Sequence, residues 1–182
     1  MRLVVIALTI LTLVACAAGS SQALTVTDDV LTGGGTSPET TVESFLNDLN
    51  KAIKDPTINR IDVRDQWADI LASYFVPVER PTQRIAIRTS LDNVANGIAQ
   101  LSADQSVMFD IQFEPARRVN DVEDIVYIEV PNATIDMMIS QNSNRGSTTI
   151  WKQNESLGYL IGSNQNIFPV MRVGARWYLT EN

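Results

Sequence analysis

The spacing of apolar residues changes once along this chain, at about Ser102, and no other feature of the sequence constrains the fold as much. Before Ser102, apolar residues recur every third or fourth position, which is the spacing of amphipathic helices. After Ser102 they alternate with polar residues, as in half-buried strands. A run of helices followed by a run of strands predicts an α+β fold. We expect three N-terminal helices packed on a curved antiparallel sheet of about five or six strands.

Three helices are predicted in the first part of the domain. The first begins at the Ser-Pro-Glu run 37–39, because a capping hydroxyl, a proline and an acid favour a helix start, and it ends at 55–56. The second runs from about Asp62 and stops before Pro77, and the third begins at Pro81. Their apolar faces consist of Val42, Phe45, Leu46, Leu49 and Ile53; Trp67, Ile70, Leu71, Tyr74 and Phe75; and Ile87, Leu91, Val94, Ile98 and Leu101.

The strands follow as short alternating segments. Pro131-Asn132 is expected to be a turn or a bulge between two of them, and Gly174-Ala175 the turn of a terminal hairpin. The residues 140–147 are polar and are left outside the strands. The expected strands are 107–113, 125–130, 133–139, 148–152, 157–161, 167–173 and 176–180.

The first 15 residues have the pattern of a signal peptide. A cationic start precedes the apolar run 3–14, which is too short to span a bilayer of about 30 Å. The run ends in Leu13-Val14-Ala15-Cys16, which resembles the bacterial lipobox. That resemblance implies cleavage before Cys16 and lipid attachment to its sulfur. The alternative is ordinary cleavage at the small-x-small sequence 15–17, which would release a secreted soluble protein.

The chain is accordingly divided into a signal peptide (1–15), a lipidated flexible tether (16–36) and a single α+β domain (37–182). The tether is rich in small and polar residues and closes with Gly33-Gly34-Gly35. Such composition is typical of flexible coil, which would lift the domain off the headgroups.

The chain contains one cysteine and no histidine. A single thiol cannot form an internal disulfide, so packing alone must hold the fold. The lack of histidine excludes Ser-His-Asp and Cys-His catalysis and every His-ligated metal site. The net charge of −7, without a basic cluster, argues against nucleic acid as a partner. We expect no catalytic residue, no cofactor and no metal.

Two groups of acidic residues were considered as sites. Asp110 or Asp136, both within strands, could be a buried acid with a raised pKa. Both alternate out of phase with the apolar residues, which favours solvated carboxylates. Asp121, Glu123 and Asp124 crowd one loop and could hold calcium weakly, but they lack the spacing of a calcium loop. A charged hairpin tip is the favoured interpretation.

Arginines recur every fourth residue on the third helix, and two more precede them in the sequence. This basic line could face anionic headgroups or an acidic partner. The favoured interpretation is a solvated face, supported by a bond from Arg88 to Asp92 one turn later. The arginines concerned are Arg60, Arg64, Arg80, Arg84 and Arg88.

Aromatic residues at helical and alternating positions could line a cavity for an apolar ligand, but such positions usually belong to the core. We therefore predict a core role for Trp67, Tyr74, Phe75, Phe109, Phe113, Trp151 and Trp177.

The opening helix and the closing hairpin, 170–179, together resemble bacterial lipoproteins with a ketosteroid-isomerase-like, cystatin-like cone domain. In that fold a strand, a tight turn, a basic residue and a Trp often end the chain, as Arg176-Trp177 do here. The resemblance would cover residues 37–182 and implies a cone-shaped domain. It implies no catalytic residue, because this fold carries many functions and several that are not enzymatic.

Two functions are expected from these features. The first is a non-enzymatic binding or assembly module of the cell envelope. It would be anchored by lipid on Cys16 to the extracytoplasmic side of the cell or outer membrane, with a possible protein partner there. The alternative is a cone whose interior acid and tyrosine, Tyr127 or Tyr159, act on a small apolar molecule. An open cavity of several hundred Å³ with an inward Asp or Tyr would favour the alternative, and a filled interior would favour the first.

Overall fold

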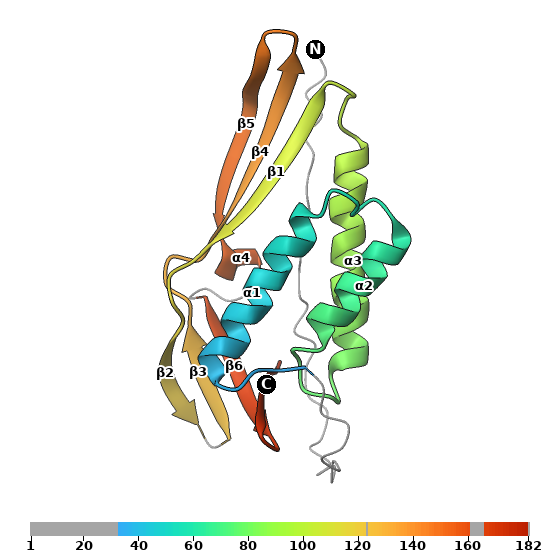
Figure 1. The fold of residues 1–182 in the computed structure, drawn as a ribbon. Coiled ribbons are helices and arrows are strands. Elements are labelled where there is room, and N and C mark those ends of the chain that lie inside the picture. Colours follow the sequence, from blue (N-terminus) through green and yellow to red (C-terminus); the bar gives the residue numbers. More distant parts are fainter. Residues whose placement is uncertain (1–32, 123, 161–165, 182) are drawn as a thin grey trace.

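The computed structural model describes residues 33–122, 124–160 and 166–181. The expected signal peptide, Cys16 and most of the expected tether lie outside these residues. Figure 1 shows helices on one side of the molecule and strands on the other. The elements in order are α1 (Pro38–Lys54), α2 (Ile61–Ala72), α3 (Arg80–Ala99), β1 (Gln105–Gln112), β2 (Arg117–Val122), β3 (Ile125–Glu129), β4 (Thr134–Ser143), β5 (Gly146–Ser156), α4 (Leu157–Leu160), β6 (Ile167–Val173) and β7 (Arg176–Leu179).

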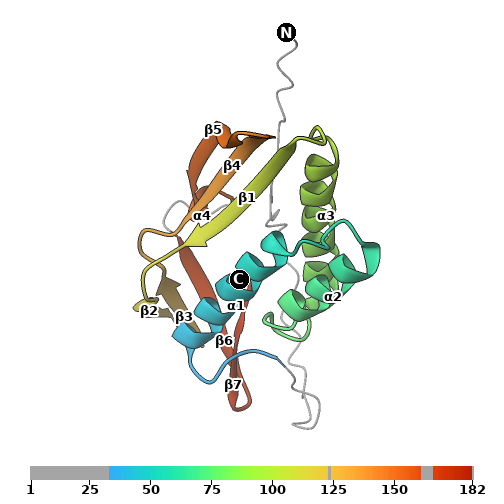
Figure 2. The ribbon, with the colours of Figure 1, turned by 45° about the horizontal axis from the view of Figure 1, so that its top comes forward.

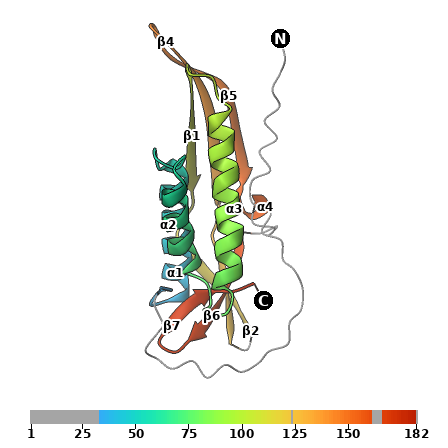
Figure 3. The ribbon, with the colours of Figure 1, turned by 90° about the vertical axis from the view of Figure 1, so that its right-hand side faces the viewer.

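The α+β class and the three N-terminal helices are confirmed. In the part of the chain that the structure describes, seven strands form two antiparallel sheets, one in the order β1-β4-β5 and the other in the order β2-β3-β6-β7. The β4–β5 hairpin extends beyond the helices at one end of the molecule, and the β6–β7 hairpin lies at the other end (Figures 1 and 3).

The division into two sheets arises where the chain passes from one sheet to the other. Pro131-Asn132, expected between two strands, is the connection from β3 in one sheet to β4 in the other. Asn132 has a φ of +52°, a left-handed conformation that suits asparagine. The flanking Val130 and Ala133 are fully buried, so this crossing is fixed in the core.

Helix α1 connects the two sheets, because it crosses the inner faces of both (Figure 2). It begins as expected: the Ser37 hydroxyl accepts a hydrogen bond from the Thr40 backbone N–H, and the Thr40 hydroxyl in turn accepts one from the Ser37 N–H. Each fully buried apolar side chain contributes about 1.5–3 kcal/mol of burial free energy. The buried apolar face consists of Val42, Phe45, Leu46, Leu49, Ala52 and Ile53.

Helices α2 and α3 lie side by side (Figure 3). Ile87, Leu91 and Val94 of α3 belong to the core, as expected from their spacing. In α2 the expected apolar face is wrong at one residue. Ile70 is exposed, whereas the adjacent Leu71 is fully buried. The buried face of α2 is therefore rotated about the helix axis toward Leu71 and leaves Ile70 in solvent.

Three segments differ from the sequence-based expectations. Strand β2 was not predicted, because all six of its residues are exposed and it has no apolar alternation. The polar stretch 140–147 is not a loop: β4 and β5 continue through it to a turn at 144–145. Within the segment predicted as a strand at 157–161, Leu157–Leu160 form the one-turn helix α4, and the side chain of its first residue is buried.

The end of the expected tether is part of the folded domain. Gly34 donates a backbone hydrogen bond to Ser73 (3.1 Å), and Gly35 exchanges two with Trp177 (2.9 and 3.0 Å). A Cβ on Gly34, whose φ is +61°, would lie 2.5 Å from the Trp177 carbonyl oxygen and from the Tyr178 ring. The glycines are therefore needed for close approach of the chain, and residues 33–36 are not flexible coil.

No helix in the described part of the chain is both long and apolar enough to cross a membrane.

We predict that Gly34→Ala destabilises the domain more than Gly146→Ala. Both glycines have a positive φ, but an added Cβ at Gly146 meets nothing within 4 Å. A side chain at positive φ strains the backbone in both variants. Only Gly34→Ala also places the new Cβ too close to neighbouring atoms, which costs about 1–3 kcal/mol more. Urea unfolding of the two variants measures the difference, and equal midpoints would show that the tight approach of residues 33–36 is not required.

Candidate functional site

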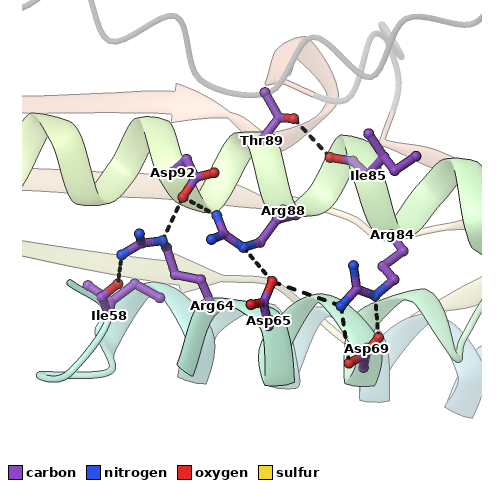
Figure 4. A network of polar contacts seen from close by, with 9 residues as sticks. All are labelled: Ile58, Arg64, Asp65, Asp69, Arg84, Ile85, Arg88, Thr89 and Asp92. Atoms are coloured by element: carbon purple, nitrogen blue, oxygen red, sulfur yellow. Dashed lines mark hydrogen bonds and ion pairs between the residues drawn. The ribbon is translucent and has the colours of Figure 1, made fainter. Parts of the chain in front are cut away.

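The arginines of α3 do not form a solvated or membrane-facing line. They form an ion-pair network with acidic residues of α2 (Figure 4). Arg88 Nε donates to Asp65 Oδ1 (2.8 Å), and Arg84 pairs with Asp69. The expected pair of Arg88 with Asp92 is present, and Asp92 also accepts from Arg64. The side chain of Arg88 is only 18% exposed, so this face is closed by α2.

The network also positions the loop between α1 and α2. Arg64 Nε donates to Asp92 Oδ1 (2.6 Å), and its Nη1 donates to the Ile58 carbonyl (2.8 Å). One guanidinium thereby joins α3 to residues 55–59. Burial raises the pKa of Asp92, but the bonds from Arg88 and Arg64 outweigh it and hold that pKa below its usual value.

The two remaining arginines of the set have different roles. Arg80 donates to the Phe75 and Ser73 carbonyls and lies over the Tyr178 ring, 5.3 Å from its centroid. Arg60 pairs with Asp62 at the surface, where both side chains are mostly exposed.

Asp110 and Asp136 lie on the outer face of their sheet, as their phase predicts. They are direct cross-strand neighbours, which sequence spacing alone did not reveal. Asp110 pairs with Lys54, and Asp136 accepts from Asn154 Nδ2 (2.6 Å). The bond from Lys54 is the main cause that holds the pKa of Asp110 below its usual value. Asp110 is therefore paired with a cation and Asp136 is bonded to a neutral amide, and neither is a buried acid.

The acidic group 121–124 does not converge in the described structure. Asp121 lies on β2 and pairs with Arg118, Asp124 is exposed, and Glu123 lies outside the described residues. Within residues 33–122, 124–160 and 166–181, no three Cys, Asp or Glu side chains are grouped so that they could hold a metal ion.

The predicted core role of the aromatic residues is wrong for Trp151, which is 41% exposed on β5. The reason is that β5 is an edge strand with almost every residue exposed. Phe75 and Phe109 are buried, and Trp67, Tyr74, Phe113 and Trp177 pack partly buried against the core.

The space between α1 and the sheets is filled by apolar side chains. Phe45 contacts Phe75 edge to face at a centroid distance of 5.7 Å, and Leu46 is fully buried beside it. Tyr127 alternates with the buried Val126 and Ile128, so it belongs to the outer face of β3. The side chain of Tyr159 lies outside the described residues.

A pocket of about 400 Å³ opens at the C-terminal end of α1. It lies between the loop 55–59, the end of α3 and strand β1. Its apolar lining includes Ile53, Ile58, Ile98, Leu101 and Phe109. Ile53, Ile58 and Phe109 also belong to the hydrophobic core, so the pocket opens directly onto it.

The two charged residues that line the pocket are already bonded. Lys54 pairs with Asp110 outside the pocket. Asp55 accepts from the Thr57 hydroxyl (2.6 Å), the Thr57 N–H (2.8 Å) and Trp67 Nε1 (2.9 Å). The Thr57 and Trp67 bonds hold the pKa of Asp55 below its usual value. Asp55 thus ends α1 and fixes the loop, and as an ionised acceptor it is a poor proton donor.

Sequence analysis missed a buried polar cluster beside the start of α3. Tyr178 is fully buried, and its hydroxyl has no hydrogen-bond partner among the described residues. Gln83, 1% exposed, donates to Glu181. Glu79 accepts from the Thr180 hydroxyl and the Glu181 N–H, and burial raises its pKa. No motif marks these residues, because the C-terminus and α3 meet only in the folded chain.

We predict that Asp92→Asn lowers the free energy of unfolding by about 1–2 kcal/mol at pH 7, after allowance for its partial exposure, because Arg64 and Arg88 lose their shared anion. The folded-state pKa of Asp92 is lowered, so its stabilisation is present above the unfolded pKa of about 3.9 and is lost as the pH falls through the folded value. The difference in unfolding free energy between the variant and wild type should therefore close below about pH 4.

The control is Asp62→Asn at an exposed position, which should change the free energy of unfolding little. If the two variants unfolded alike at pH 7, the network would not stabilise the fold.

No family model and no curated protein matches this chain. Among solved structures, it is similar to the phospholipid-binding protein from Ralstonia solanacearum in complex with a phospholipid. The two chains are 18% identical, and the match covers 66% of this chain and 79% of that one with a TM-score of 0.26. A score this low transfers neither fold nor function.

Proposed function

We propose that this chain is a non-enzymatic binding or assembly module of the cell envelope, anchored by lipid on Cys16 to the extracytoplasmic side of the cell membrane or outer membrane. The binding role rests on one observation. The pocket at the end of α1 is open, its lining combines apolar with uncharged polar side chains, and both of its charged lining residues are already engaged in the fold. Such a site is suited to holding a partner rather than to moving protons.

The anchoring part rests on the lipobox-like sequence 13–16, which follows an apolar run of signal-peptide length. The chain has one cysteine, and it stands at the position that the lipobox requires.

The alternative, a cone that acts on a small apolar molecule, needs an inward acid or tyrosine. Asp110, Asp136 and Tyr127 all lie on outer sheet faces. The resemblance to ketosteroid-isomerase-like lipoproteins stays a proposal about shape and carries no catalytic residue.

Replacement of Cys16 tests the anchor. The expected result is that Cys16→Ser abolishes incorporation of labelled palmitate and moves the protein from the membrane to the soluble fraction, because acyl chains contribute about 0.8 kcal/mol per buried CH₂. Ala17→Ser, one residue away, keeps the cysteine and should stay in the membrane fraction. Mass spectrometry of the native N-terminus gives the opposing outcome: an unmodified Ala17 or Ala18 would identify a secreted soluble protein.

A further inference from the structure

One wall of the pocket is the open edge of a sheet. Strand β1 stands at the edge of the β1-β4-β5 sheet, and residues 105–109 line the pocket. An edge strand presents backbone N–H and C=O groups that can pair with another chain. The hydrogen bonds of neighbouring residues determine which residues of β1 point these groups toward the pocket.

Asn50 of α1 fixes the direction of the β1 backbone. Its side-chain Oδ1 accepts from the Ile111 N–H (2.9 Å), and its Nδ2 donates to the Ile111 carbonyl (3.4 Å). Both backbone groups of Ile111 therefore point away from β4. In an antiparallel pair the residues whose groups point outward alternate along the strand. The register of β1 with β4 is unbroken, so Phe109 and Val107 point outward as well.

A second bond supports this assignment. The Asp104 carbonyl accepts from the Asn142 N–H (2.7 Å), so the residues of even number are the ones that pair with β4. In the described part of the chain, no residue bonds the outward groups of Val107 and Phe109. Two N–H and two C=O groups thus face the pocket in the spacing of a strand.

The remaining walls carry apolar side chains beside polar ones such as Asn59 and Ser102. The apolar ones are Ile53, Ile58, Ile98 and Leu101. Asn50 occupies the edge at Ile111 and ends the open stretch on one side. On the other side the Gln105 N–H already donates to the Ser102 carbonyl (2.8 Å), so the free edge from Ser106 to Phe109 is about 10 Å long and matches three or four extended residues.

We propose that this pocket, the β1 groove, binds an extended, uncharged polypeptide segment of a partner protein as an added strand on β1. The proposal rests on the binding role proposed above and specifies its ligand. Backbone groups at strand spacing are matched by another backbone, and the apolar walls take alternate side chains. Lys54 is engaged by Asp110, and Asp55 accepts hydrogen bonds from Thr57 and Trp67, so neither is free to pair with a charged side chain of the segment.

The other edge of the sheet differs in each of these respects. Strand β5 is exposed along its length and is interrupted by a bulge at Ile150. It has no opposing wall, because solvent covers both of its faces. The β1 groove is therefore the edge at which both backbone pairing and burial of side chains are available.

Hydrogen exchange of the full chain in detergent tests the proposal, and it does so whether or not Cys16 carries lipid. In the free protein, the amides of Val107 and Phe109 should exchange at least tenfold faster than those of Met108 and Asp110, which pair with β4. The peptide acetyl-Thr-Val-Thr-Val-Thr-amide, at millimolar concentration, should slow Val107 and Phe109 at least tenfold. Protection of these two amides in the free chain would overturn the proposal, since the edge would already be occupied, for example by residues 17–32.

Two matched changes separate strand pairing from simple burial. Val107→Pro removes the outward N–H and leaves the hydrogen bonds to β4 intact, so it should weaken peptide binding at least fivefold. Val107→Thr keeps the N–H and should bind the peptide as wild type does.

A peptide methylated on alternate amide nitrogens, added to the wild-type chain, should not bind, and it covers the case in which the proline variant does not fold. Equal binding of the methylated peptide would show a general apolar pocket and would reject strand addition. Neither result depends on the palmitate experiment, so the two proposals fail separately.

Discussion

The packing of α1 against the inner faces of both sheets is the contact on which the rest of the molecule depends. The two sheets share no strand, and Pro131-Asn132 is one of the connections by which the chain passes between them. Val42 and Leu46 are fully buried in the core that α1 forms with strands of both sheets. Because an interior of this kind is close-packed, the position of α1 also determines where Asn50 meets β1 and where the pocket opens.

Helices α2 and α3 are attached to this unit by charge as well as by apolar contact. Arg64 and Arg88 share Asp92, and Arg64 also holds the Ile58 carbonyl. The loop after α1 is consequently held against α3, with Asp55 bonded to Trp67 beneath it. The charged groups of the pocket wall are thus bonded inside the fold, Lys54 to Asp110 and Asp55 to Thr57 and Trp67.

Sequence patterns predicted the helices well because α1 and α3 carry their apolar residues at helical spacing and α1 begins with a capping serine and a proline. They predicted strands β1, β3, β6 and β7, in which one face is buried. They missed β2, whose residues are all exposed, and they placed Trp151 in the core because local alternation does not tell an edge strand from a central one. The arginine network and the hydrogen bonds of Asn50 could not be predicted from the sequence either, since they join residues far apart along the chain. Of the pocket, the sequence predicted apolar residues at several lining positions, such as Ile53, Ile98 and Phe109, but not that the fold brings them together around an opening.

The bulge at Ile150 affects how copies of the protein can associate through their edge strands. A flat strand of eleven residues, nine of them exposed, would offer identical neighbours a template for lateral growth into ribbons. The extra residue bends the strand and breaks the repeat of its hydrogen-bonding groups in the middle, so two copies cannot match along the whole length. The bulge thereby opposes ribbon growth through β5 without another element having to cover that strand.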